Sequence, residues 1–330
     1  MTLRPAHEPV RPRPPAGFAV PVPKHSAPPV GAVSPVAVRA GCEFGLTALL
    51  LFLVVTAVRW LVGTGSPVAV VFGPPLATAV LGLVTGGLLT VLMVSSPGRC
   101  SGCHLNPAVT LALWRLGAFP GRDVAPYALA QLAGSLAGAW SAGALWGPAA
   151  TGDPVRSASV RPDPAWSDAA VLGAEAVVLV GVTVMLAVFL SRPVGSRGLP
   201  YAVGVTTAVV IAVLGRSSGG SANPARQFGP AVLAGDVDRL WVYLLGPVLG
   251  AVLGAVLVDA VRCRRRSGAG PWAGAGPWTR VGPWAGVAPW AKVGPWPGFG
   301  PWSGVSPWAG LLRRSPLRRR CARGDGSPRR

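Results

Sequence analysis

Acidic side chains are scarce in this 330-residue chain, and their scarcity excludes whole classes of protein. The chain has 11 Asp and Glu residues against 30 Lys and Arg residues, and only three His. We find no paired catalytic carboxylates on a soluble domain, no phosphate-binding loop and no nucleophile elbow. The five cysteines are odd in number and follow no disulfide-scaffold pattern. Nothing in this composition points to an enzyme or to a disulfide-stabilised secreted module.

A metal site is also not expected. Cys100, Cys103 and His104 form a Cys-x-x-Cys-His run that superficially suggests zinc. A structural zinc site needs four ligands with a second pair nearby. The two other histidines, His7 and His25, lie far away in a Pro-rich arm. We therefore expect neither a metal nor another cofactor.

Long polar stretches are missing from the body of the chain, which is apolar instead. Hydrophobic residues make up 51% of the sequence and charged residues 12%, about half the charged share of a soluble domain. The apolar runs are long enough to cross a bilayer. They predict six membrane spans, at about Ala40–Val62, Leu76–Val94, Ala125–Leu145, Ala169–Leu190, Tyr201–Leu214 and Leu240–Val261. No signal-peptide core precedes Arg39, so the first span is expected to remain as an anchor.

The composition divides the chain into three parts. Residues 1–38 are rich in proline and predict a disordered cytoplasmic arm, and residues 39–262 form the hydrophobic channel-like body. Residues 263–330 carry thirteen Lys or Arg and one Asp, together with a Pro-Trp pair every six residues from Pro271 to Trp308. We interpret this part as a flexible low-complexity cytoplasmic tail. Alternatively, its Trp and Arg residues hold it on the anionic inner leaflet; nucleic acid is not the expected partner.

Two short stretches organise the body. Ser101–Thr110 contains Asn106-Pro107-Ala108, and Ser218–Arg226 contains Asn223-Pro224-Ala225. Asn is a favoured helix N-cap and Pro a favoured first helical residue, so each stretch predicts a loop that enters a short helix. Non-helical backbone at membrane depth is tolerated where protein buries it or a water-filled cavity solvates it. Two such loops between spans therefore predict a pore.

The order of elements predicts an inverted repeat. Each half has three spans and one half-length helix, and an odd number of spans turns the second half over relative to the first. Glycines recur on one stripe of the third span (Gly134 and Gly138) and of the sixth (Gly246, Gly250 and Gly254), which favours close helix packing. Six spans place both termini on one side. Arg262, Arg264, Arg265 and Arg266, supported by Arg192 and Arg197, place that side in the cytoplasm.

The paired Asn-Pro-Ala signatures, the second followed by Arg226, resemble those of the major intrinsic protein family of aquaporins and aquaglyceroporins over residues 39–262. The resemblance implies an all-α membrane fold of six transmembrane helices and two re-entrant half-helices, assembled as a homotetramer. It also implies that Asn106 and Asn223 donate hydrogen bonds to a passing solute at a central constriction. Each half opens with an intramembrane carboxylate, Glu43 or Glu175. We favour a structural role in which both accept backbone N–H groups from the loops over a proton relay.

The family pattern further implies an outer selectivity filter of four residues. Counting from the two signatures assigns these positions to Gly86, Ile211, Gly220 and Arg226. Such a ring lacks the aromatic residue and the His of water-selective members and resembles the ring of nodulin-like intrinsic proteins. It suits a neutral polyhydroxy solute, with hydroxyls on Arg226 and carbon on Ile211. Gln227 and Ala231 depart from the pattern of glycerol facilitators.

Two functions of different classes remain. The first is a passive channel in the plasma or inner membrane for water or small neutral solutes such as glycerol, urea or boric acid, closed to ions and protons. The second is a membrane-anchored interaction protein with a vestigial pore, whose basic tail binds lipid or nucleic acid. The intact Asn106, Asn223 and Arg226 favour the channel.

Overall fold

The computed structural model describes residues 35–192 and 195–266, and the regular structure within these ranges is helical. Six long helices and two half-length helices are present, as the sequence predicts. The long helices are α1 (Val36–Leu61), α2 (Pro67–Val94), α5 (Val124–Trp146), α7 (Asp168–Leu190), α8 (Gly195–Leu214) and α10 (Leu240–Arg266). The half-length helices are α4 (Pro107–Arg115) and α9 (Pro224–Ala234). Four short helices lie in the connections: α3 (Ser96–Ser101), η1 (Gly121–Asp123), α6 (Pro148–Thr151) and η2 (Arg156–Ala158).

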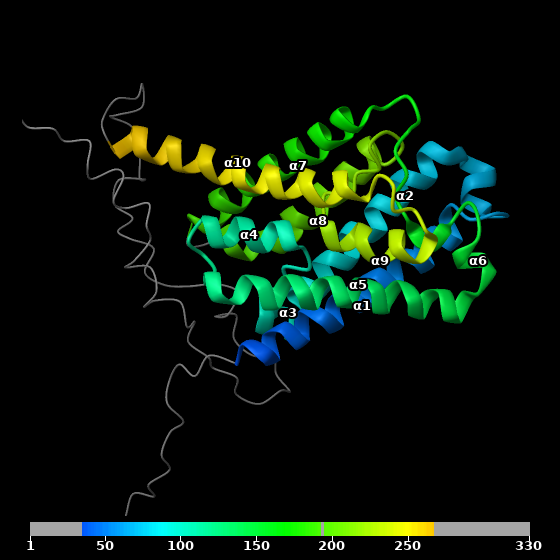
Figure 1. Ribbon diagram of the computed structural model, residues 1–330, viewed down its shortest axis with the longest axis horizontal. Coiled ribbons are helices and arrows are strands. Elements are labelled where there is room, and N and C mark those ends of the chain that lie inside the picture. The colour runs from blue at the N-terminus through cyan, green and yellow to red at the C-terminus, as the bar shows by residue number, and fades with distance from the viewer. Residues whose placement is uncertain (1–34, 193–194, 267–330) are drawn as a thin grey trace, which may run out of the picture. The chain divides into compact units, whose positions relative to one another are not determined.

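The long helices pack in pairs that repeat between the halves. Helix α1 lies along α5 in the first half, α7 lies along α10 in the second, and α2 pairs with α8 across the halves (Figure 1). The half-helices lie inside this bundle, where α4 packs on α10 and α9 packs on α5. Each half therefore inserts its short helix against the third long helix of the other half.

The pairs within each half approach closely at glycine. A Cβ atom at Gly138 of α5 would collide with the carbonyl oxygen of Ala48 on α1, and one at Gly250 of α10 would collide with that of Ala176 on α7. The predicted glycine stripes thus make the same backbone contact in both halves. Lipid offers little hydrophobic drive for helix association, so close backbone approach becomes a main source of packing energy.

The outer faces of the bundle are apolar. Leu83 of α2 is 67% exposed, Val177 of α7 71% and Val205 of α8 65%. Five helices (α1, α2, α7, α8 and α10) are long and apolar enough to cross a membrane. Helix α5 has 23 residues, which is also a spanning length, but it is not one of the five. Its many Ala and Gly residues, together with the buried Gln131, serve helix packing and lower its hydropathy.

Some element boundaries differ from the sequence prediction. Helix α1 begins at Val36 rather than Ala40, because Arg39 is buried and paired with Asp123 at 2.6 Å. Helix α2 contains a break at Gly73 (φ 76°, ψ 165°) followed by two prolines, and its continuous part agrees with the predicted second span. Helix α10 continues to Arg266. The predicted arm and tail lie almost wholly outside the described residues.

Candidate functional site: a cavity between two half-helices

Helices α4 and α9 begin at the two Asn-Pro-Ala signatures and are capped by their asparagines. The Asn106 side-chain oxygen accepts the backbone N–H groups of Ala108 (2.9 Å) and Val109 (3.3 Å). The Asn223 oxygen accepts that of Ala225 (2.9 Å). Because Oδ1 is engaged in capping, the amide nitrogen Nδ2 of each asparagine has a fixed direction.

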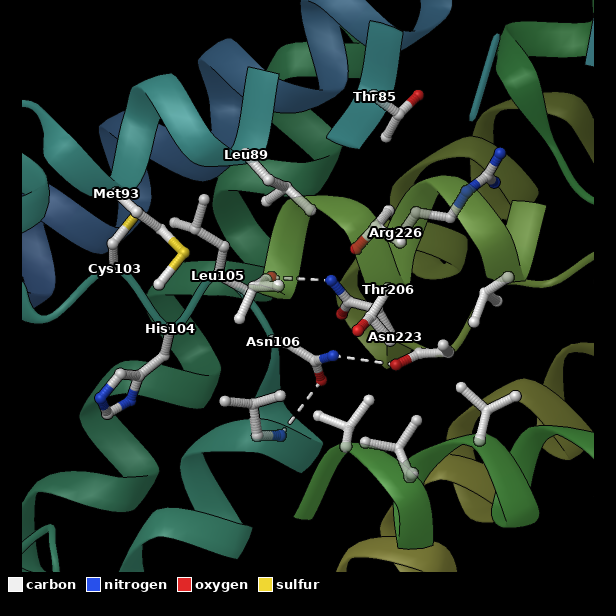
Figure 2. A pocket seen from close by; sticks show the side chains of 18 of the residues that line it. Thr85, Leu89, Met93, Cys103, His104, Leu105, Asn106, Thr206, Asn223 and Arg226 are labelled. Atoms are coloured by element: carbon white, nitrogen blue, oxygen red, sulfur yellow. Dashed lines mark hydrogen bonds between the residues drawn. The ribbon is translucent and has the colours of Figure 1, made fainter. Parts of the chain in front are cut away.

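The two asparagines also bind each other's loop. Asn106 Nδ2 donates to the carbonyl of Ala222 (2.9 Å), and Asn223 Nδ2 donates to that of Leu105 (2.8 Å). Leu105 and Ala222 each have φ of 50°, an uncommon left-handed conformation that turns these carbonyls towards the facing asparagine. An amide nitrogen carries two N–H groups. One on each asparagine is thus used between the loops, and the second remains for a molecule in the cavity, where both side chains lie (Figure 2).

Buried carboxylates hold both loops from behind. Glu43 of α1 accepts the backbone N–H groups of 104 and 105 at 3.0 and 2.8 Å. Glu175 of α7 accepts those of 221 and 222 at 3.1 and 2.5 Å. Both carboxylates are almost fully buried. These are the hydrogen bonds expected for a structural role, so the loop conformations depend on one acid in each half.

Two tyrosines, which the sequence reasoning missed, repeat this arrangement. Tyr127 of α5 donates its hydroxyl to the Ser101 carbonyl (2.8 Å), and Tyr243 of α10 donates to the Ser218 carbonyl (2.5 Å). Both side chains are fully buried. A signal was available, since they follow the Asn of their own signature by 21 and 20 residues and the chain has only three tyrosines.

A cavity of about 150 Å³ runs along the paired loops. Residues 102–106 and 220–223 of the two loops form a polar wall of the cavity, and residues of α2, α7 and α8 form a second wall. Thr85, Leu89 and Met93 of α2 are among the side chains that Figure 2 shows on the cavity. The second wall is mainly aliphatic, with Leu89, Val178, Val182, Val203 and Ile211 among its residues. The side chains of Pro107, Ala108, Pro224 and Ala225 lie outside the lining, in the first turns of the half-helices. A path with polar groups on one side and hydrocarbon on the other suits small neutral molecules.

Three of the four predicted filter residues lie on this cavity, and the fourth, Gly86, does not. Ile211, Gly220 and Arg226 line it, whereas Gly86 does not and Thr85 takes that place. A Cβ atom at Gly86 would collide with the carbonyl oxygen of Gly204, so this glycine serves the α2–α8 contact. The cavity-lining residue therefore precedes the counted position by one residue. A helix turns by about 100° per residue, which is enough to move a side chain off the wall.

A loop residue fixes the guanidinium of Arg226. Arg226 Nη1 donates to the carbonyl of Ala158 (2.7 Å) and to Gln227 Oε1 (3.3 Å). Gln227 in turn pairs with Val160, accepting its N–H at 3.0 Å and donating to its carbonyl at 2.9 Å. The connection between the two halves thus completes the site. This contact could not be predicted, because residues 152–167 form a loop without periodicity and nothing in their sequence indicates where the loop packs.

His104 lies at the far end of the cavity from Arg226 (Figure 2). Its Nδ1 is 3.1 Å from Thr110 Oγ1, and its ring packs against Phe119 with centroids 4.7 Å apart. Residues 35–192 and 195–266 contain no group of three or more His, Cys, Asp or Glu that could hold a metal.

Comparisons with known proteins agree with this geometry. Residues 34–258 match the family model described as Major intrinsic protein. Aquaporin NIP1-3 of Oryza sativa subsp. japonica is 42% identical over 171 residues, which is 51% of this chain and 57% of that protein. Aquaporin AqpM of Methanothermobacter marburgensis is 37% identical over 175 residues, or 50% of this chain and 70% of that protein.

A solved structure shows the same fold. The aquaglyceroporin from Plasmodium falciparum has a TM-score of 0.59 and 21% identity, over 69% of this chain and 98% of that chain. The matched part spans little more than half of the rice protein. The family match covers most of the chain, and its helices are apolar enough to cross a bilayer. The chain is therefore a multi-pass membrane protein that belongs to the major intrinsic protein family.

Proposed function

We propose that the protein is a passive channel for water and small neutral solutes and has no enzymatic activity. The observation that carries this proposal is the pair of capped asparagines at the tips of α4 and α9, side by side on one continuous cavity. Each has a free N–H group in a direction fixed by its cap. A solute oxygen can exchange hydrogen bonds along the loop backbone and these amides, while its carbon lies against the aliphatic wall.

Exclusion of ions follows from the charges around the same point. Each half-helix places roughly half a positive charge at its N-terminus, and both N-termini face the cavity. Arg226 adds a full positive charge on the wall. Cations are repelled, and an anion would have to leave its hydration shell between aliphatic walls. A neutral molecule bears neither cost.

The filter favours solutes larger than water. Thr85, Ile211 and Gly220 are small or aliphatic, and Arg226 provides the donors. We propose glycerol, urea and boric acid or related metalloid acids as the solutes. They combine hydroxyl or amide groups with no net charge, and the names of the relatives, which are aquaporins and an aquaglyceroporin, are compatible with this class.

We further propose the plasma or inner membrane as the location, both termini in the cytoplasm and a homotetrameric assembly. Charge supports the orientation. Arg192 in the α7–α8 connection, Arg197 in the first turn of α8, and Arg262 and Arg264 at the end of α10 give one end of the bundle a positive charge, whereas the α6–α7 and α9–α10 connections together carry three Arg and four Asp and are not net positive. The basic end belongs on the cytoplasmic side. A membrane-anchored interaction protein with a vestigial pore would not need two capped asparagines or an arginine held by loop contacts. We therefore do not propose this alternative.

Reconstitution in liposomes tests the proposal. Water, glycerol, urea and boric acid are compared by stopped-flow light scattering on one preparation. Leu89→Trp places a large ring on the cavity wall of α2, and Leu83→Trp places the same ring on the exposed face of the same helix. Flux should be high in the parent and in Leu83→Trp and fall to that of empty liposomes in Leu89→Trp. Equal flux in the two variants would refute a path through this cavity.

A further inference from the structure

The loop segment 156–161 contacts two different parts of the chain in alternation. Ala158 and Val160 bind the Arg226–Gln227 pair at the cavity. Arg156, Ser159 and Arg161 of the same segment bind the carboxylate of Asp236 instead. One short segment therefore links the filter arginine to an acid that does not line the cavity.

Asp236 is held in place by the helix that carries Arg226. It follows the left-handed Gly235 at the end of α9, and its N–H donates to the Ala231 carbonyl at 2.9 Å. Its carboxylate is mostly buried, with 13% of the side chain exposed. Arg226 lies near the start of α9 and Asp236 just beyond its end. The half-helix thus fixes the distance between the two.

Arg156 and Arg161 each donate two hydrogen bonds to the carboxylate of Asp236. Arg156 donates from Nη2 to Oδ1 (2.7 Å) and from Nε to Oδ2 (3.1 Å), a bidentate pair. Arg161 donates from Nη2 (2.7 Å) and Nε (3.1 Å) to Oδ1. Arg156 Nη2 also reaches the Ala234 carbonyl at 3.1 Å. Such charge-assisted, partly buried contacts are the strong class of hydrogen bond and fix orientation as well as distance.

The segment needs such a restraint. Arg156, Ser157 and Ala158 have φ of 45°, 54° and 61°, three successive left-handed residues of which none is glycine. L-amino acids visit this region as single residues and at an energetic cost, so a run of three persists only when surrounding contacts determine it. This run of left-handed residues turns the Ala158 carbonyl towards Arg226. Ser157 and Ala158 are buried, so the run cannot relax into solvent without opening the loop.

We propose that Asp236 is a positioning residue for solute selectivity, which acts through Arg156 and Arg161 to hold the Ala158 carbonyl against Arg226. This inference depends on the proposed channel function. Asp236 touches no solute. It neutralises two cations beside the filter and keeps the strained turn closed, so that Arg226 presents its remaining N–H groups to the solute from one fixed position.

The experiment compares three variants of the full-length channel in liposomes. Asp236→Asn removes the charge, Asp236→Glu retains it, and Asp153→Asn is the matched control. Asp153 also contacts Arg156, at 3.4 Å, but its side chain is 74% exposed. Two readouts are taken: the ratio of glycerol to water permeability, and amide hydrogen exchange of residues 157–161 in the purified protein. Loss of folded channels lowers both fluxes together and leaves their ratio unchanged.

We expect Asp236→Asn to speed exchange in 157–161 and to change the glycerol-to-water ratio by about three- to ten-fold, since the net contribution of one hydrogen bond corresponds to a ratio of that order. Asp236→Glu should bring both the exchange rate and the permeability ratio close to those of the parent, and Asp153→Asn should match the parent in both. Unchanged exchange, an unchanged ratio, or the same effect in Asp153→Asn would overturn the proposal. A parent that passes neither water nor glycerol would instead refute the channel function, and the exchange data would still decide whether Asp236 holds the segment.

Discussion

At the scale of single residues, the charge of Arg226 sets the character of the cavity. It is the only Lys, Arg, Asp or Glu among the described cavity-lining residues. Its Nη1 is engaged by Ala158 and Gln227, so its position does not depend on a solute. A fixed cation on the wall of a cavity repels other cations and presents donors to neutral oxygen atoms.

Replacing Arg226 should therefore open a leak. In Arg226→Val the half-helix dipoles act alone, and proton or cation entry into liposomes, followed with a pH-sensitive dye, should become measurable. Arg226→Lys keeps the charge and should stay closer to the parent. A Val variant as tight as the parent would show that the dipoles of α4 and α9 suffice.

The width of the filter should depend on Thr85 and not on its neighbour. Thr85→Phe adds a ring on the cavity wall and should lower glycerol flux by about ten-fold or more while water still passes. In Gly86→Phe the Cβ atom itself would collide with the Gly204 carbonyl oxygen, so this variant should reduce the amount of folded channel instead. Stopped-flow permeability, normalised to correctly inserted protein, separates the two. Selective loss of glycerol flux in Gly86→Phe would restore the original assignment.

The ion pairs of Asp236 imply that the selectivity between glycerol and water does not change with pH near neutrality. Burial raises the pKa of this carboxyl, but the hydrogen bonds from Arg156, Arg161 and Ser159 together lower it to about 2. Since an unperturbed Asp has a pKa of about 3.9, its folded-state contribution is complete above that pH and is lost as pH falls through about 2. The glycerol-to-water ratio should stay constant between pH 8 and pH 5. A change within that window would assign control to another titrating group.

At the scale of elements, the two re-entrant loops are near copies of each other. Each is held by a buried Glu from the first long helix of its half and a buried Tyr from the third. The backbone repeats as well, with Gly102 and Gly219 at φ of 93° and 96°. Equivalent contacts in the two halves should contribute similar free energies to the stability of the fold.

Removing either carboxylate should then destabilise the fold by a similar amount. Glu43→Gln and Glu175→Gln each leave one acceptor oxygen where several donors converge. A buried donor without a partner costs about 1–3 kcal/mol. We expect each variant to unfold at a temperature lower by roughly 3–10 °C in detergent, against a control substitution of the exposed Asp238, Asp238→Asn. A large loss in only one variant would show that the halves are not energetically equivalent.

These elements also show what the sequence could predict. Apolar runs of bilayer length and the capping pattern of Asn106 and Asn223 are local, so they located the long helices and both half-helices. Which residue of α2 faces the cavity depends on the rotation of the helix, and a count along the sequence pointed to Gly86 where the neighbouring Thr85 lines the cavity. The contact of Ala158 with Arg226 joins residues 68 positions apart through a loop of unusual dihedral angles. No periodic pattern encodes such a contact.

At the scale of the whole molecule, the described bundle contains every residue of the proposed path. The cavity is lined from Leu50 to Arg226, and helix α10 runs on to Arg266. The basic Pro-Trp tail follows and lies outside the described residues. Proline at every sixth position disfavours a continuous helix, and a single Asp cannot neutralise its many Arg residues.

The tail should therefore be dispensable for transport and act at the membrane surface. Deleting residues 267–330 should leave the flux per inserted channel unchanged, because no lining residue is removed. Each Lys or Arg near an anionic leaflet contributes about 1 kcal/mol, screened within a Debye length of about 8 Å at physiological salt. The isolated tail peptide should thus bind anionic vesicles tightly at low salt and weakly at high salt. Loss of flux in a correctly inserted truncation would show that the tail gates the pore, and equal binding to neutral vesicles would exclude the electrostatic account.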